Sequence, residues 1–307
     1  ASQADISAPG TWVMQYYKIQ LANGKKYQLK VGANLEWTDA AQINNQVEVS
    51  GILKKIIPGQ PEIIAYSSDI TKHGFLYLLF EHRSGVKLSA LLDERRDDLT
   101  QLYAQLGEVY GRIHSITNPW AGIWGGSSSQ QKYPIHPAAF YSTAELSKGS
   151  LKYLLDRNKI DQAMYQKVQS IWKNNLDYLC SRPNSLVHVS AFPWTILFDP
   201  GRDYPSIRCL RALGDFMWWD PMYDVANILY PPYFTISDVE REAFLATYHL
   251  TIEEKAIHLY MLLNRVLAFT GCFMPPLGRD RVENWINQEI PSLETLVGEI
   301  GCNNPPA

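Results

Sequence analysis

The sequence predicts an α+β protein with two lobes, a small β-rich lobe at the N-terminus and a larger α-helical lobe behind it. The chain has 307 residues, of which 46% are hydrophobic and 19% are charged, so it can bury a substantial core. Near residue 90, the spacing of apolar residues changes from a strand-like to a helix-like pattern. We therefore expect a small lobe over 1–80, a hinge over 81–88 and a helical lobe over 89–307.

The small lobe contains four predicted strands and one predicted helix. The first two strands are separated by Asn23-Gly24, a dipeptide that favours the tight turn of a hairpin. A run with apolar residues near helical spacing covers 39–55 and is stopped by Pro58-Gly59. The four strand patterns cover 14–21, 26–31, 62–66 and 75–81.

Helical patterns dominate after residue 88. The clearest covers 99–116, whose apolar residues fall on one stripe. Further helical patterns cover 142–155, 161–179, 239–248, 253–270 and 281–300. Among them lies an island of short strand patterns, over 186–189, 196–199 and 207–210. Strands that interrupt a helical lobe present loops, and loops on a rigid scaffold often carry function.

Composition and charge exclude several functional classes. The 28 Lys and Arg against 31 Asp and Glu leave a net charge of -3, so the basic surface that nucleic-acid binding needs is missing. The four cysteines lie far apart without a CxxC pair, which is typical of thiols in a reducing compartment. The first residues lack the features of a signal peptide, and polar residues interrupt the apolar stretch 256–273. We expect a cytoplasmic protein with neither a nucleic-acid nor a membrane partner.

The segment 186–230 carries an ordered series of motifs. They are His188, the pair Phe192-Pro193, the strand 196–199, Asp220-Pro221, and Tyr223-Asp224-Val225-Ala226 at the start of a helix. This series resembles the signature region of the aminoglycoside phosphotransferase and choline kinase-like families, which share the protein-kinase fold. The resemblance implies a bilobal protein-kinase-like fold with its catalytic loop region over 186–226.

The resemblance extends into the small lobe. It implies that Lys30 stands where the family has the lysine that grips phosphate, and that Gln46 stands where the family has the glutamate that pairs with it. Glu48 is an alternative partner if the helix is shifted. The pair Phe80-Glu81 resembles the hinge, and 111–115 resembles the end of a helix in the large lobe.

Three departures from the family pattern make this catalytic loop degenerate. Ser190 replaces the catalytic aspartate, Thr195 replaces the metal-binding asparagine, and Ala212 aligns with the aspartate of the metal motif. Alanine offers no ligand oxygen, and a threonine hydroxyl is a poor ligand for Mg²⁺. Loss of a positioned base typically costs about 10²–10⁴ in rate. Asp215 could serve as a ligand only through a register shift that breaks the alignment from Asp220 onward. We therefore predict no cofactor and no metal site, and no ordinary chemistry with Mg-ATP.

Other side chains have both a functional and a structural interpretation. His188 and Ser190 could suggest a nucleophile with its base, but no nucleophile elbow surrounds Ser190, and the resemblance gives His188 the role of fixing the loop backbone. Trp218, Trp219 and Tyr223 follow the metal motif, where the family has its acceptor pocket. They could bind a flat or cationic organic ligand, or pack in the core.

Three functions remain open on this sequence. One is a pseudokinase that keeps its cleft for a ligand or a protein partner. The second is an enzyme of secondary metabolism with non-phosphoryl chemistry, such as cyclisation or isomerisation. The third is a residual small-molecule O-phosphotransferase. We favour loss of phosphoryl transfer and a small-molecule ligand in the cleft. The candidate ligand-binding residues are Lys30, Gln46, Thr195, Ala212, Asp215, Trp218, Trp219 and Tyr223, and the candidate catalytic residues are His188 and Ser190.

Overall fold

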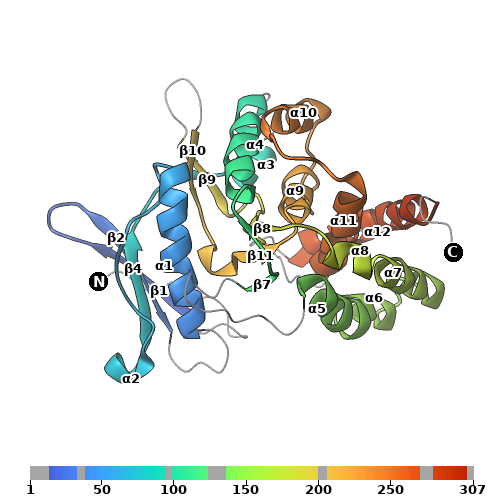
Figure 1. Cartoon of the computed structure of the whole chain (residues 1–307), viewed down its shortest axis with the longest axis horizontal. Coiled ribbons are helices and arrows are strands. Elements are labelled where there is room, and N and C mark those ends of the chain that lie inside the picture. Colours follow the sequence, from blue (N-terminus) through green and yellow to red (C-terminus); the bar gives the residue numbers. More distant parts are fainter. Residues whose placement is uncertain are drawn as a thin grey trace.

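The computed structural model describes residues 14–32, 39–94, 99–123, 136–199, 206–269 and 279–302. It shows the predicted α+β arrangement, with a β-sheet and one long helix at one end and a helical body at the other (Figure 1). Within the described part of the chain, no helix is both long and apolar enough to cross a membrane.

The small lobe is built on a four-stranded antiparallel sheet. Its strands are β1 (Met14–Gln20), β2 (Lys26–Gly32), β3 (Ile63–Ser67) and β4 (Leu76–Glu81), in the order β1-β2-β4-β3. Gly24 has a φ of 82° in the predicted hairpin turn, a conformation that glycine adopts without strain. All four predicted strands are present. The short helix α2 (Ile70–His73), which the sequence analysis did not predict, lies between β3 and β4.

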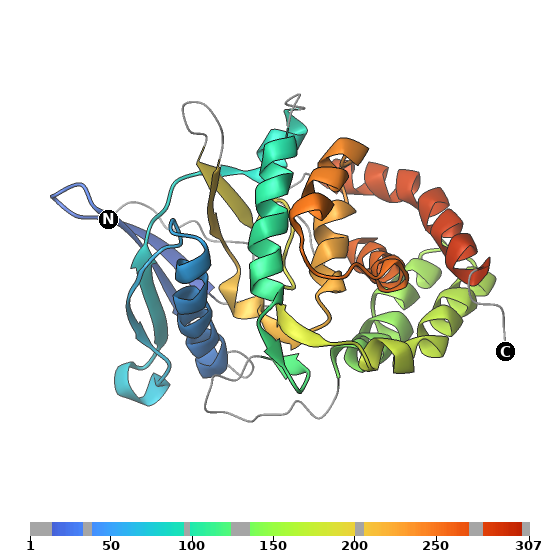
Figure 2. The same cartoon turned by 45° about the horizontal axis from the view of Figure 1, so that its top comes forward.

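Helix α1 (Asp39–Ile56) lies between this sheet and the helical lobe (Figure 2). On one side, Ile43 packs with Leu76 and Leu78 of β4 in a small apolar cluster. On the other side, Val49 and Leu53 belong to the main core of the helical lobe. The helix therefore has apolar contacts on two faces, which fixes its place between the lobes.

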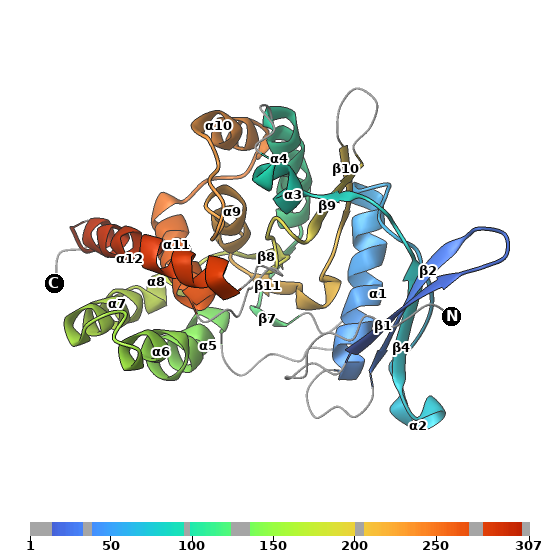
Figure 3. The same cartoon turned by 180° about the vertical axis from the view of Figure 1, so that it is seen from behind.

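The helical lobe is organised around α4 (Thr100–His114) and a bundle beside it. Helix α4 buries its predicted apolar stripe, and α10 (Asp238–Thr247) packs along it, while α9 (Met222–Leu229) packs on α11 (Glu254–Phe269). The remaining helices are α3 (Leu88–Asp93), α5 (Pro137–Thr143), α6 (Ser150–Asp156), α7 (Gln162–Asn174), α8 (Leu176–Cys180) and α12 (Arg279–Cys302). Seen from behind, α12, α6 and α7 lie at the end opposite the small lobe (Figure 3).

Two helices that the sequence predicted as continuous are interrupted. The run 142–155 is divided into the end of α5, a π-helical turn (Ala144–Lys148) and α6, with Gly149 at the break. A side chain at Gly149 would meet the Ala144 carbonyl oxygen at 2.7 Å. The run 161–179 is divided into α7 and α8 at Asn175, whose buried amide donates to the Ile171 carbonyl at 2.8 Å. Periodicity did not reveal either break, because the apolar spacing continues through both.

Two small sheets form the predicted strand island. One has the order β10-β9-β5, from Ser206–Leu210, Ile196–Asp199 and Val86–Lys87. The other has the order β6-β8-β11-β7, from Thr117–Asn118, Asn184–Val187, Met217–Trp219 and Gly122–Ile123. Strand β11 was not predicted, and it turns the segment after Asp215 inward.

The C-terminal end of α1 is attached to the helical lobe by polar contacts. The buried Gln60 donates to the Leu210 carbonyl at 3.0 Å and accepts from the Leu210 amide at 3.1 Å. Arg112 of α4 donates to the carbonyls of Lys55 and Ile56 at 3.1 and 3.4 Å. These carbonyls end a helix and lack partners within it, so the contacts both cap α1 and hold the two lobes together.

Candidate functional site

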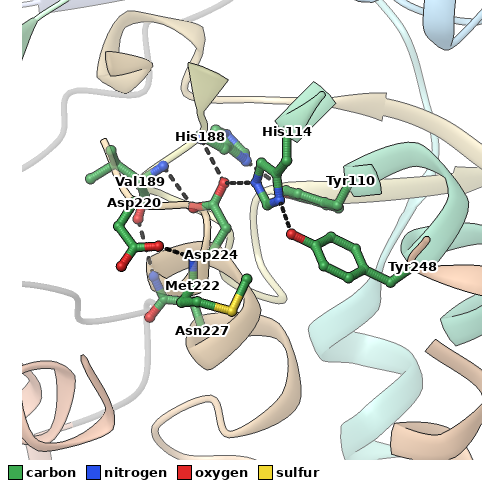
Figure 4. A network of polar contacts seen from close by, with 9 residues as sticks. All are labelled: Tyr110, His114, His188, Val189, Asp220, Met222, Asp224, Asn227 and Tyr248. Carbon is green, nitrogen blue, oxygen red and sulfur yellow. Dashed lines mark hydrogen bonds and ion pairs between the residues drawn. The ribbon is translucent and has the colours of Figure 1, made fainter. Parts of the chain in front are cut away.

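Asp224 anchors the catalytic loop from below (Figure 4). Its carboxylate is fully buried at the start of α9 and accepts from the backbone amides of His188 and Val189, at 2.6 and 2.9 Å. It also accepts from His114 Nε2 at 3.1 Å. Val189 has a φ of 64°, a strained conformation for a β-branched residue. The hydrogen bonds that the Asp224 carboxylate accepts from the loop amides therefore hold the loop in a shape that Val189 alone disfavours.

His188 joins the catalytic loop to the strand that precedes Ala212. Its Nε2 donates to the Arg211 carbonyl at 2.6 Å, so its Nδ1 accepts from the Tyr110 hydroxyl at 2.9 Å. The imidazole is fully buried, and this burial lowers the pKa of His188. It does not line the cavity described below, so this geometry places His188 as a structural link.

Further polar contacts are made by motif residues that follow the loop in sequence (Figure 4). Asp220 accepts from the Met222 amide and from Arg182 Nε, both at 3.0 Å. Burial raises the pKa of Asp220, and the Arg182 charge opposes this rise. Asn227 donates to the Val189 carbonyl at 3.3 Å. Asn227 thus holds the loop backbone, whereas Asp220 fixes the turn before α9.

An interlobe cavity of about 580 Å³ lies beside this loop. It brings together four of the candidate residues, namely Lys30, Gln46, Ala212 and Asp215. Its apolar walls come from both lobes and include Ile63, Leu78, Phe80, Leu197 and Leu210. A cavity of this size, with apolar walls and a few convergent polar groups, is typical of a small-molecule site.

Lys30 and Gln46 face each other across the cavity wall. Lys30 Nζ donates to Gln46 Oε1 at 3.4 Å, and it also lies 6.0 Å from the centre of the Tyr16 ring. The helix register is therefore the one that pairs Lys30 with Gln46 rather than with Glu48. The contact therefore joins the lysine to a neutral amide, where the family pattern has a glutamate.

Ser190 and Asp215 meet at one end of the cavity. Ser190 Oγ donates to Asp215 Oδ2 at 2.5 Å, although 25 positions separate them. A 3₁₀ turn, Leu213–Asp215, carries the carboxylate back to the loop without any shift of the Asp220 motif. Asp215 therefore contacts the loop at Ser190 with the alignment from Asp220 onward unchanged, and whether it could serve as a metal ligand stays a prediction.

The donor set does not fit the two metal ligands that the resemblance implies. Ala212 has no ligand oxygen, and its φ of 57° shows the left-handed conformation. The buried Thr195 hydroxyl lies 2.5 Å from the Ser190 carbonyl and 2.8 Å from the Phe192 carbonyl, and it donates into the loop itself. Among the described residues, no group of three His, Cys, Asp or Glu side chains could hold a metal ion. Asp215 is the one carboxylate that the described residues place at this end of the cavity.

The three aromatic candidates lie away from the cavity. Trp219 and Tyr223 are fully buried, with ring centres 4.3 Å apart, and Trp219 also stacks on Tyr141. Trp218 is 7% exposed and contacts the edge of Trp120. The three side chains belong to the main core. Of the two interpretations, ligand binding and core packing, the structure shows core packing.

Arg211 and Gln60 are among the residues of the cavity wall that sequence reasoning missed. Arg211 precedes Ala212, and Gln60 joins the lobes. The position of Arg211 next to the metal motif could have indicated its place. No local signal could have indicated Gln60, whose partner Leu210 is 150 positions away.

Known proteins share this architecture. Wild-type aminoglycoside 2'-phosphotransferase-IIIa with GDP is 15% identical, with a TM-score of 0.60 over 99% of this chain and 94% of that one. A thermostable mutant of aminoglycoside phosphotransferase APH(4)-Ia with AMP-PNP and hygromycin B is 17% identical, with a TM-score of 0.58 over 99% and 95%. A candidate fructosamine-3-kinase from Thermobifida fusca is 12% identical, with a TM-score of 0.57 over 97% and 94%. These likenesses confirm the protein-kinase-like fold.

At the level of sequence, no curated protein matches significantly. The family described as the phosphotransferase enzyme family matches residues 11–260, from the first strand into α11. That range includes the small lobe, the cavity, the catalytic loop and the helical lobe as far as the first part of α11. The resemblance inferred from the motifs is therefore confirmed, and this chain belongs to the phosphotransferase enzyme family.

Proposed function

We propose that this protein binds a small organic molecule in the interlobe cavity and has lost phosphoryl transfer from Mg-ATP. The observation that carries the proposal is the side-chain set of the catalytic loop, where Ser190 and Ala212 stand in place of two carboxylates. A hydroxyl group does not act as a base near neutral pH, and a methyl group does not bind Mg²⁺.

Phosphoryl transfer depends on positioning and on neutralising the charge of the phosphates. In protein kinases an Asp and an Asn hold the Mg²⁺ ions that bridge the β- and γ-phosphates. The Thr195 hydroxyl donates to loop carbonyls, so it is unsuited to replace the Asn. Loss of the base and of both ligands falls on one chemical step, and together they argue against turnover.

The cavity supports a small-molecule ligand rather than a purely structural role. Similar solved structures contain GDP, or AMP-PNP with hygromycin B. The apolar walls of this cavity suit a flat organic group, and Lys30 suits an acidic one. The ligand then serves either as the effector of a pseudokinase or as the substrate of a non-phosphoryl reaction.

The test combines a transfer assay with a binding assay. With [γ-³²P]ATP, Mg²⁺ and a panel of aminoglycosides and sugars, we expect no labelled product. In a thermal-shift screen of nucleotides and metabolites, we expect a ligand that stabilises the protein by about 2.7 kcal/mol at 100 times its Kd. Lys30→Gln should remove this shift, while Lys26→Gln, at an exposed position of the same strand, should keep it. Labelled product, or a screen without any ligand, would contradict the proposal.

A second candidate is a residual O-phosphotransferase, favoured by the hydrogen bond from Ser190 to Asp215. This contact brings a carboxylate beside the residue that replaces the base, at 2.5 Å. Asp215 would then accept the proton of the acceptor hydroxyl. In that case Asp215→Asn should abolish label transfer, whereas Asp199→Asn, which changes a carboxylate paired with Arg208 and not lining the cavity, should retain it.

A further inference from the structure

Helix α1 contacts two separate apolar clusters. On the sheet side, Ile43 packs with Leu76 and Leu78 in a cluster of three buried residues. On the other side, Val49 and Leu53 belong to the main core of the helical lobe. Among the described residues, the two clusters have no member in common. The sheet therefore packs on α1 through a small core of its own, whereas α1 shares the core of the helical lobe.

The contacts between the end of α1 and the helical lobe are close. Gln60 makes two buried hydrogen bonds with the backbone of Leu210, at 3.0 and 3.1 Å. Arg112 of α4 donates to two carbonyls at the end of α1. A Cβ atom at Gly59 would lie 2.4 Å from the Arg208 carbonyl oxygen, so the two backbones touch there. Because buried hydrogen bonds and close backbone packing resist displacement, α1 is held by the helical lobe.

The seam between α1 and β3, by contrast, is open to the surface. A groove of about 480 Å³ follows it, lined by Val47 and Gly51 of α1 and by Ile64 and Tyr66 of β3, among others. Ile64 and Tyr66 are 49% and 47% exposed, and a Cβ atom at Gly51 would project into open space. The packing between the sheet and α1 is therefore incomplete on this side, which is typical of parts that move separately.

Two connections between the sheet and the rest of the chain lie side by side. One enters β3 after Glu62 and the other leaves β4 at Glu81, and the Glu81 amide donates to the Glu62 carbonyl at 2.9 Å. The chain is fixed again at Gly85, where a Cβ atom would lie 2.8 Å from the Phe198 carbonyl oxygen. The link between β2 and α1, over 33–38, lies outside the described residues. Two adjacent connections form one axis about which a sheet can rotate.

We propose that the interlobe cavity opens by rotation of the four-stranded sheet about this axis, while α1 stays with the helical lobe. The sheet contributes Lys30, Leu78 and Phe80 to the cavity, whereas Gln46 comes from α1 and Asp215 from the helical lobe. The rotation separates Lys30 from Gln46, whose 3.4 Å contact joins the sheet to α1, and it widens the cavity. This inference goes beyond the proposed function, because it concerns the chain without a ligand.

Distances between pairs of spin labels test the rotation in the full chain without a ligand. The labels are attached to Lys72→Cys in α2, Asn44→Cys in α1 and Lys152→Cys in α6, in a chain whose native cysteines are replaced by alanine. All three positions are exposed, and α2 lies between β3 and β4 at the end of the sheet away from the axis (Figure 1). We expect the distribution of distances from 72 to 152 to be at least about twofold wider than that from 44 to 152.

A variant of the small cluster adds a second measurement. Leu76→Ala removes contact between the sheet and α1, so the mean distance from 72 to 152 should change by more than about 2 Å, and that from 44 to 152 should stay the same. Val168→Ala is the matched control, because it shortens a buried side chain of α7 in the main core, and it should change neither distance. Circular dichroism checks that each variant is folded.

The outcomes separate this inference from the proposed function. Equal widths for the two label pairs would mean that α1 and the sheet move as one body, and would overturn the inference. An equal response of both pairs to Leu76→Ala, or no response of either pair, would overturn it as well. A ligand screen without a hit, or transfer of label from Mg-ATP, would contradict the proposed function alone, because the distances are measured without a ligand.

Discussion

The Ser190 hydroxyl donates a 2.5 Å hydrogen bond to the carboxylate of Asp215. The two residues come from different segments, the catalytic loop and the 3₁₀ turn Leu213–Asp215. The family pattern has an aspartate in the loop at the position of Ser190. This chain has a hydroxyl group there, hydrogen-bonded to the carboxylate of Asp215. The carboxylate at this end of the cavity therefore comes from the 3₁₀ turn and not from the catalytic loop.

The first prediction concerns a second carboxylate at this point. In Ser190→Asp, the new side chain faces Asp215, and repulsion between like charges raises the pKa of one of the pair. A folded-state pKa above the unfolded value gives stability that is present at low pH and lost as pH rises through the folded value. The variant should therefore lose about 1 kcal/mol between pH 4.5 and pH 7.5 relative to the native chain, a modest amount because Asp215 is exposed.

Urea denaturation at the two pH values measures this effect. Ser190→Asn is the uncharged control, and Ser190→Asp with Asp215→Asn should remove the extra pH dependence. If Ser190→Asp and Ser190→Asn depend on pH in the same way, the two side chains do not interact as described.

The second prediction concerns the anchor of the loop. Asp224→Ala removes the acceptor for two loop amides and for His114, all buried. Because these donors would lack partners, the free energy of unfolding should fall by about 3–5 kcal/mol. Chemical denaturation measures it, with Asp224→Asn as a milder variant that keeps one acceptor oxygen. Asp156→Ala, which removes an exposed pair with Lys152, should change stability little, and an equal loss in both would refute the anchoring role.

The third prediction concerns the contact between the lobes. A Cβ atom at Gly59 would lie 2.4 Å from the Arg208 carbonyl oxygen, too close for any atom pair without a hydrogen bond. Gly59→Ala should therefore destabilise the protein by about 1–3 kcal/mol, because backbone must shift. Gly51→Ala is the control, in α1 with open space around it, and it should stabilise by about 0.5–1 kcal/mol. Thermal melts measure the change in Tm of each variant. A change of the same sign in both variants would contradict the close approach of Gly59 to Arg208.

The fourth prediction concerns pH. Burial lowers the pKa of His188, and it also lowers those of His82 and His136. The unfolded state therefore binds more protons, and stability should fall as pH drops below about 6.5, by at most about 1.4 kcal/mol per pH unit for each group. Denaturation at pH 7.5 and pH 5.5 should show this loss, with a smaller loss in His188→Gln. If the free energy of unfolding falls by the same amount in the native chain and in His188→Gln, His188 does not contribute to the pH dependence as described.

Much of the architecture could be predicted from local pattern. The hairpin at Asn23-Gly24, the four strands of the small lobe and the stripe of α4 all follow from spacing and turn chemistry, because each depends on neighbours in sequence. The family pattern left Gln46 and Glu48 as alternative partners of Lys30, and the structure shows a 3.4 Å contact between Lys30 and Gln46. The breaks at Gly149 and Asn175 were not predicted, since tertiary packing selects them.

The sequence by itself determined which chemical groups are present. Ser190 and Ala212 bring a hydroxyl and a methyl group to positions where the family pattern has carboxylates, and Arg211 brings a guanidinium group directly before Ala212. Only the tertiary structure decided where those groups lie. A short turn brings Asp215 to Ser190, and strand β11 buries Trp219 away from the cavity. The physical reason is that side-chain chemistry is a local property, whereas distance and burial result from packing among segments far apart in the chain.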